Sequence, residues 1–460
     1  MPLILPGNVA SAVPTAFSID NSCRFDDGDT AWVEKDSSSV AEKKIGTISF
    51  WMKRGNITAA QTNIVNHNST GYCVVALLAG SQIRFYSGEH DLSSTAVLRD
   101  PAAWYHIFAN WDTTQGVAAN RAKLYVNGVQ VTLFATETYP DANDELPFFV
   151  DSEAVVVGRN PSPGNYFDGY LAEVVALEGT AAAVTDFGEF DSDSPTIWKP
   201  IEHAQSGNKG ANGFYLDFKD SSNLGNDAYG GTDLAETDLA AADQATDTPT
   251  NNFCTMNPLI RPYAAPASFA QGNCKIVSHT DQWGGTSSTI GMTAGKWYAE
   301  CKLAGADPLT GVFIGIFDEV VTNNFLQTNP MNATGASVFY NADGGEWKVD
   351  GSLVGDNDYG IYATSGDIAG IALNVDDGEI TLYKNNSALF SGIDISSTKN
   401  TLFFGGAFTA DTTCEWNFGG CSAFTISSAA ADGNGYGTFE YAPPSGYLAI
   451  CTKNLGSDGG

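Results

Sequence analysis

The chain has 460 residues, and its 53 acidic residues against 22 basic ones give a formal net charge of −31 at pH 7. This charge repels the phosphates of nucleic acids and of anionic membrane surfaces, so we expect neither as a partner. No run approaches the roughly 20 apolar residues of a membrane-spanning helix, which excludes membrane insertion by that route. The length predicts two domains, and the 49 glycines predict many short strands joined by turns.

Residues 1–19 have no charged side chain and include the apolar run Leu3, Ile4 and Leu5. The segment lacks the basic start of a signal peptide, and Pro6 interrupts its apolar run. It is too short to form its own core. Two interpretations stay open: an arm that docks on another subunit, or a strip that packs along the first domain.

Residues 20–220 predict the first β-sandwich. Residues 47–53 alternate, with Ile48, Phe50 and Met52 on one face, which is typical of a strand with one buried side. Residues 123–131 predict a hairpin, because Asn127-Gly128 supplies the positive φ angles of a tight turn.

Residues 221–253 differ in composition. No Lys or Arg occurs between Lys219 and Arg261, while Asp and Glu recur among Gly, Ala, Asn and Thr. We therefore expect an acidic connector between two domains.

Residues 254–460 predict a second β-sandwich, so the fold class is all-β with two sandwiches in series. Residues 311–317 predict a strand buried on both faces, and residues 370–384 predict a hairpin that turns at Gly378. The eight cysteines form no CxxC pair and are expected to be mostly thiols, with Cys301 on the apolar face of its strand.

The first domain resembles the laminin-G and concanavalin A-like jelly roll. The matching stretches are residues 48–53 (ISFWMK), 104–106 (WYH), 124–128 (LYVNG), 157–159 (VGR) and 167–174 (FDGYLAEV). The second domain resembles a SPRY domain at residues 295–300 (GKWYAE), 366–373 and 382–386 (LYKNN). Asn386 stands where that family usually has glycine, and asparagine also tolerates the left-handed conformation.

The whole chain resembles structural proteins of tailed phages, especially marine ones, through residues 1–8, 247–253 and 441–451 together with the two domain types. The resemblance implies a fibre, appendage or decoration component of the virion, made in the host cytoplasm and released by lysis. It implies other virion proteins as partners and a homo-oligomer, and residues 1–19 are the candidate arm for these contacts.

A catalytic centre is not evident in the sequence. Glycosidases on related folds need paired carboxylates, and the nearest approach is Glu189, Asp191 and Asp193 in a turn without the final glutamate. The five histidines form no catalytic or metal array, and we expect His106 to pack in a strand. The chain is therefore expected not to be an enzyme, and a glycan hydrolase is disfavoured.

Two kinds of binding site remain. Loops with Asp26, Asp27 and Asp29, and with Asp141 and Asp144, could supply oxygens to calcium, the one cofactor considered, or could be ordinary acidic turns.

Aromatic rings in loops stack on sugars, and Trp283, Trp347 and Tyr359 are the candidates for such a patch. The leading hypothesis is a non-enzymatic virion surface protein that binds a host-surface glycan or protein. The alternative is a purely structural decoration or assembly protein.

Overall fold

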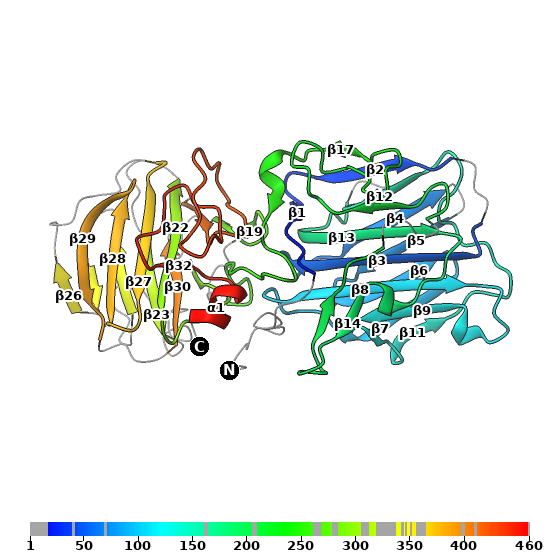
Figure 1. Cartoon of the computed structure of the whole chain (residues 1–460), viewed down its shortest axis with the longest axis horizontal. Helices are drawn as coiled ribbons and strands as arrows, with labels where there is room; N and C mark the ends of the chain where they lie inside the picture. Colours follow the sequence, from blue (N-terminus) through cyan, green and yellow to red (C-terminus); the bar gives the residue numbers. More distant parts are fainter. Residues whose placement is uncertain are drawn as a thin grey trace. The chain divides into compact units, whose positions relative to one another are not determined.

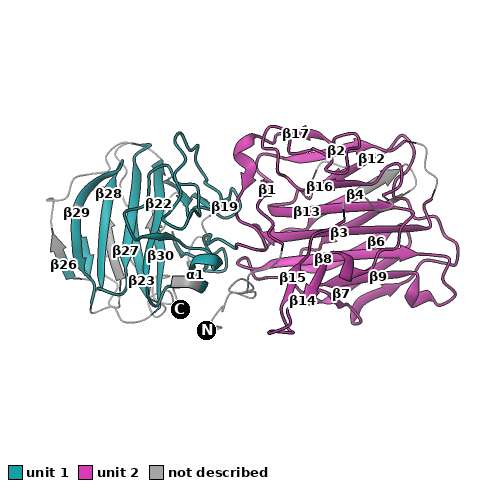
Figure 2. Ribbon diagram, in the orientation of Figure 1, with its two compact units in different colours: residues 1–12, 252–460 teal, residues 13–251 magenta. Residues whose placement is uncertain are grey.

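The computed structural model shows a nearly all-β protein (Figure 1). It describes residues 17–458 with the exception of 39–41, 69–70, 161–163, 205–208, 261–267, 278–283, 305–311, 319–336, 342–344, 346, 350–351, 356–364, 397–400 and 409–411. The chain forms two compact units, which divide between Asn251 and Asn252 (Figure 2). Residues 13–251 belong to unit 2, and residues 252–460 belong to unit 1.

Unit 2 contains two eight-stranded sheets. The first sheet has the order β10 (Val129–Gln130), β9 (Ala122–Val126), β8 (Trp104–Asp112), β3 (Ile45–Arg54), β13 (Gly169–Glu178), β1 (Ser22–Phe25) and β18 (Gln244–Ala245), with β16 (Phe214–Leu216) on β13. The second has the order β11 (Phe134–Thr138), β7 (His90–Val97), β6 (Gln82–Ser87), β5 (Gly71–Leu77), β4 (Gln61–Asn68), β12 (Ala154–Val157), β2 (Trp32–Asp36) and β17 (Ala235–Thr237). Outside these sheets lie the hairpin of β14 (Gly188–Phe190) and β15 (Trp198–Pro200) and the 3-10 turns η1 (Ala118–Asn120), η2 (Val184–Asp186) and η3 (Ala241–Asp243).

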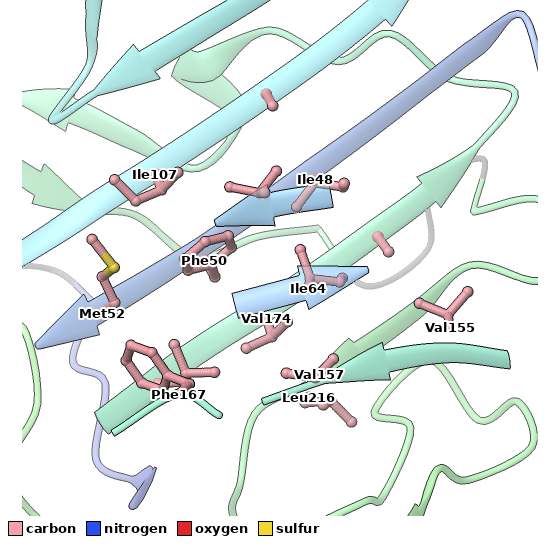
Figure 3. Packing of buried hydrophobic residues seen from close by; sticks show 14 of the residues in the cluster. Ile48, Phe50, Met52, Ile64, Ile107, Val155, Val157, Phe167, Val174 and Leu216 are labelled. Atoms are coloured by element: carbon pink, nitrogen blue, oxygen red, sulfur yellow. The ribbon is translucent and has the colours of Figure 1, made fainter. Parts of the chain in front are cut away.

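The core of unit 2 lies between the two sheets. Ile48, Phe50 and Met52 point from β3 toward Ile64 and Val157 of the second sheet (Figure 3), as the alternation predicts. The opposite face of β3 is also buried, because the chain after β13 covers that side of the sheet. Alternation thus predicts which residues share a face, but not whether a further layer covers the second face.

The hairpin between β9 and β10 has the expected turn. Asn127 and Gly128 have φ angles of 48° and 74°, as a tight two-residue connection requires. A Cβ on Gly128 would also approach Trp198 to 2.2 Å, so glycine is needed here for space as well as for conformation.

The connector is expected at residues 221–253, but residues 221–251 are part of unit 2. They add β17 beside β2 and β18 beside β1. Their acidic side chains meet the basic residues of the sandwich, since Asp243 pairs with Arg24 at 2.9 Å and Asp247 pairs with Lys53 at 2.6 Å. An acidic stretch that looks solvated in the sequence is therefore held by ion pairs.

Unit 1 has an eight-stranded and a six-stranded sheet. The first has the order β19 (Ser268–Ala270), β20 (Lys275–Val277), β31 (Thr413–Asn417), β22 (Lys296–Ala304), β27 (Ile368–Asn374), β28 (Glu379–Lys384) and β29 (Ser387–Asp394), with β32 (Leu448–Ala449) parallel to β22. The second has the order β21 (Gly284–Ser287), β30 (Leu402–Phe408), β23 (Val312–Asp318), β24 (Ser337–Asn341), β25 (Trp347–Val349) and β26 (Ser352–Gly355); α1 (Thr452–Asp458) follows β32.

Several predictions for the second domain agree with unit 1. β23 is buried along its whole length, and Ile371 and Cys301 lie in the core. Asn386 has a φ of 68°, which is the left-handed conformation expected there. All eight cysteines of the chain are buried and present as thiols. Among the described residues, no helix is long and apolar enough to cross a membrane.

Candidate functional site

The outer face of the second sheet of unit 2 gathers aromatic side chains. Alternate residues of β5 and β6 point into the core, so Tyr72, Arg84 and Tyr86 point away from it. Trp32 lies on the same outer face, on β2. Val74 and Val156 lie beneath the rings and are 4% and 2% exposed. The result is an apolar floor on the side of the sheet that faces away from the core.

The rings form two pairs. Tyr72 and Tyr86 have ring centroids 5.0 Å apart, and Trp32 and Tyr166 have centroids 6.3 Å apart. β2 and β5 are separated by β12 and β4, so these two strands lie about 14 Å apart at the usual spacing of neighbouring strands. Their register also offsets Trp32 from Tyr72 by about four residues along the strands. Both pairs are half-buried, which leaves part of their area available to a ligand.

An arginine covers one ring of each pair. The Arg84 guanidinium lies 4.0 Å from the Tyr86 centroid, and that of Arg159 lies 4.1 Å from the Trp32 centroid. Asp91 pairs with Arg84 at 2.6 Å. Glu34 likewise pairs with Arg159 at 3.3 Å. The face therefore presents rings and hydrogen-bonding groups with little excess charge.

The aromatic candidates from the sequence lie elsewhere. The prediction of an exposed loop ring at Trp347 is wrong: this side chain is 0% exposed and lies in the core of unit 1. A loop is the expectation at Trp347, but β25 begins at this residue and pairs with β24 and β26. Trp283 and Tyr359 lie outside the described residues.

Sequence reasoning missed the rings on the outer face. Trp32, Glu34 and Asp36 alternate with Val33 and Lys35, which is a signal for a strand with a half-polar outer face. An aromatic residue at such a position looks like core material until the opposite face is known to be buried. The alternation was the available signal, and the sheet order was needed to interpret it.

The calcium candidates form two separate groups. Asp26, Asp27 and Asp29 lie near the Arg54 end of β3, whereas Asp141 and Asp144 lie near its Ile45 end, about 30 Å away along ten residues of strand. The two groups therefore cannot share one ion. No set of three His, Cys, Asp or Glu residues suited to a metal occurs within the part of the chain that the structure describes.

The local bonds of these aspartates stabilise their own loops. The Asp26 carboxylate accepts hydrogen bonds from the backbone N–H groups of Gly28 at 2.7 Å and Asp29 at 3.3 Å. Asp144 accepts a hydrogen bond from the backbone N–H of Asp141 at 3.0 Å, and its carboxylate lies 2.9 Å from His90 Nε2. These contacts are typical of acidic turns, and calcium binding stays a prediction.

A third carboxyl group, Asp168, lies beside the first group. It is 1% exposed, and burial together with the neighbouring carboxylates of Asp27 and Asp26 raises the pKa of Asp168 well above its usual value. A proton held on Asp168 relieves the repulsion among the three carboxyl groups. In the sequence, Phe167-Asp168-Gly169 is part of the stretch that resembles the jelly roll, and it gives no indication that Asp168 lies beside Asp26 and Asp27.

Ser49 and His106 lie next to each other on the covered face of the first sheet, as a nucleophile and base would. The Trp198 indole N–H donates a hydrogen bond to His106 Nδ1 at 3.1 Å, which leaves the Nε2 atom as the protonated nitrogen. His106 Nε2 therefore donates to Ser49 Oγ at 2.9 Å and cannot accept its proton. Burial lowers the pKa of His106 to about 3, so the ring stays neutral and the pair is structural.

Glu173 lies nearby, in a bulge of β13, and provides a test of this buried network. It has a φ of 51°, and its carboxyl group accepts a hydrogen bond from the Tyr215 hydroxyl. Burial raises the pKa of Glu173 from 4.5 to about 7. Because the folded pKa is the higher one, the stabilisation is full below about pH 4.5 and is lost as the pH rises through about 7.

We expect the free energy of unfolding of unit 2 to fall by up to about 3 kcal/mol over this pH range. Glu173→Gln, which keeps the shape and the acceptor for Tyr215, should remove that part of the pH dependence. Denaturant unfolding of both proteins at pH 4.5, 6 and 8 measures it. Parallel pH profiles for the two proteins would contradict the assignment.

The acidic turn after β14 is also held by a lysine. Lys199 Nζ lies 3.2 Å from Glu189 and 3.4 Å from Asp191, and Asp191 accepts backbone hydrogen bonds from Asp193 and Ser194 at 2.9 Å. The lysine bridges the two strands of one hairpin, and the backbone hydrogen bonds stabilise its turn. The arrangement is that of a stabilised turn, and not of two carboxylates that face each other across a bound sugar.

Comparison with known proteins gives information about fold. No curated protein sequence matches the chain. Among solved structures, similar ones include the SPRY domain of human HERC1 (14% identity, 35% of this chain and 96% of that chain, TM-score 0.30), a proposed carbohydrate-binding protein from Bacteroides ovatus (13%, 48% and 59%, TM-score 0.33) and a SAP-like pentraxin from Limulus polyphemus (13%, 36% and 81%, TM-score 0.27). Residues 27–181 match the family model Laminin_G_3, described as the concanavalin A-like lectin/glucanases superfamily, so unit 2 contains a concanavalin A-like jelly roll.

Proposed function

We propose that the chain is a non-enzymatic glycan-binding protein and that unit 2 binds the glycan on the outer face of its second sheet. The observation that carries the proposal is the pair of aromatic platforms, Trp32–Tyr166 and Tyr72–Tyr86, each covered on one side by an arginine. Flat rings stack on the apolar faces of sugars, and the ion-paired arginines and carboxylates bind hydroxyl groups.

Two further observations support this function. The family model that matches residues 27–181 describes a superfamily of lectins and glucanases. Within unit 2, Ser49 and His106 have hydrogen bonds that prevent general-base chemistry, and Glu189 and Asp191 are engaged by Lys199. Binding without hydrolysis fits these contacts.

Binding to a glycan array tests the proposal. Trp32→Ala and Tyr86→Ala should each weaken the best glycan about tenfold, because buried aromatic contacts dominate the energetics of such interfaces. Phe190→Ala is the matched control, since this ring is 42% exposed on β14 and is not part of the face. Unchanged affinity in both face variants, or an equal loss in the control, would contradict the site.

We further propose that the chain acts on the surface of a phage particle, as a fibre, appendage or decoration protein. The likeness of residues 1–8, 247–253 and 441–451 to phage structural proteins supports this location. Residues 1–16 lie outside the described residues, so their role as an arm toward other virion proteins or a second copy stays a prediction. Mass spectrometry of purified particles from the phage that encodes the chain tests the location.

A further inference from the structure

A polar groove of about 520 Å³ lies beside the aromatic face. One wall is β2, with Glu34, Lys35 and Asp36. The other wall comes from the segment 211–235, including Asn212, Thr232, Asp233 and Ala235. The volume is within the usual range for sites that bind small ligands.

The groove continues the aromatic face along β2, beyond Trp32. Glu34 lines the groove and also pairs with Arg159, whose guanidinium lies over the Trp32 ring. Glu34 and Asp36 follow Trp32 at every second position of β2, so a chain that lies on Trp32 and runs along β2 reaches the groove next. Because the second wall follows residue 181, it is formed by a part of the chain that the family model does not cover.

A buried carboxylate stiffens the groove. Asp227 has a side-chain exposure of 0%, and it lies 4.0 Å from Lys35 Nζ and 3.4 Å from Lys209 Nζ. It also accepts hydrogen bonds from the backbone N–H groups of Tyr215, Tyr229 and Gly231 at 3.0 to 3.1 Å. The wall and the lysine of the groove are thus held in place before a ligand arrives, which lowers the ordering cost of binding.

The charges of the groove select the class of ligand. Glu34, Asp36 and Asp233 line it with one lysine, Lys35, so acidic groups outnumber basic ones. Together with a net charge of −31, this lining disfavours uronic acids and sulfated sugars. Hydroxyl groups can both donate to the carboxylates and accept from the ammonium group.

We propose that the groove is a further sugar subsite, and that the ligand of unit 2 is a neutral oligosaccharide that lies on the outer face and contacts the Tyr72–Tyr86 pair, Trp32 and the groove. The strands that carry Trp32 and Tyr72 are about 14 Å apart, which already exceeds one sugar ring, so an extended chain is needed to contact both aromatic pairs. This inference rests on the proposed function and names its ligand class.

The test uses the full chain with neutral cello-, xylo- and manno-oligosaccharides, from disaccharide to hexasaccharide, and with oligogalacturonates as the acidic series. Calorimetry should show an affinity that rises about tenfold with length in one neutral series and no comparable binding of the acidic series. Ala235→Trp fills the groove from an exposed position and should remove the gain of the longest oligosaccharides while preserving disaccharide affinity. Trp32→Ala should weaken every length.

Ala119→Trp, in the exposed turn η1 between β8 and β9, is the matched control for a surface tryptophan. If Ala235→Trp has a lower melting temperature than Ala119→Trp, Asp36→Ala provides the same test of the groove without an added large side chain. If both groove variants keep the gain in affinity with length, the groove is not a subsite, and the proposed function is unaffected. If oligogalacturonates bind better than the neutral series, the neutral ligand class is wrong. Failure of the wild-type chain to bind any glycan would overturn the proposed function and this inference with it.

Discussion

Phe50→Asp is expected to unfold unit 2 and leave unit 1 folded, and Ile371→Asp is expected to do the reverse. Phe50 is 1% exposed and Ile371 is 0% exposed, each at the centre of its own core. Either substitution removes buried apolar contacts and places a carboxylate among the apolar side chains of a core. The cost is at least about 5 kcal/mol, which is comparable to the whole stability of a domain.

Hydrogen exchange followed by mass spectrometry separates the two units, because each peptide reports on its own sheet. Peptides from β3 and β8 should lose protection in Phe50→Asp, and peptides from β22 and β27 should lose it in Ile371→Asp. Val129→Asp and Leu353→Asp are the controls, since these side chains are 60% and 52% exposed and should change stability by less than about 0.5 kcal/mol. Loss of protection in both units from either core variant would show that they unfold together.

Asp247→Ala is expected to destabilise unit 2 by about 3–5 kcal/mol. Asp247 and Lys53 are both 1% exposed in their side chains, with 2.6 Å between Oδ2 and Nζ, and the Trp104 indole N–H donates to the other carboxylate oxygen at 3.0 Å. Removing the carboxylate leaves the ammonium group buried without its ion-pair partner. Denaturant unfolding at neutral pH measures the loss.

The double variant Lys53→Met with Asp247→Leu distinguishes the cause. Replacing both charges with apolar groups should restore most of the stability, since a buried ion pair is close in energy to a well-packed apolar pair. Glu189→Ala is the surface control: its pair with Lys199 has one side chain 57% exposed and should contribute no more than about 1 kcal/mol. A double variant as unstable as Asp247→Ala would mean that shape, and not charge, is what the site requires.

Local signals in the sequence predicted the fold class well. The turn at Asn127-Gly128, the core side of β3 and the fully buried β23 each depend on residues close together in the chain. The role of residues 221–251 depends instead on pairs such as Lys53 with Asp247, which are 194 residues apart. A run of acidic residues does not indicate which distant lysine it will meet, so a connector was the simpler prediction.

The sequence predicted the type of candidate site, an aromatic surface, but not the residues that form it. An aromatic surface for sugars was expected, but Trp347 is in a core, while Trp32 and Tyr86 are on an outer face. Side chains alternate between the two faces of a strand, so the residues of either face recur at every second position. Only the order of strands in the sheets shows which face another layer covers.

The two ends of unit 2 are tied to each other, and this has a mechanical consequence. The Ile19 N–H donates to Thr250 Oγ1 at 3.0 Å, Thr250 Oγ1 donates back to the Ile19 carbonyl at 2.8 Å, and Ser22 Oγ donates to the Asp247 carbonyl at 2.7 Å. When the chain is pulled at the segments before and after unit 2, these hydrogen bonds between residues 19–22 and 247–250 bear the force. The second sheet, with its aromatic face, lies outside that line of force and keeps its shape while the chain is pulled.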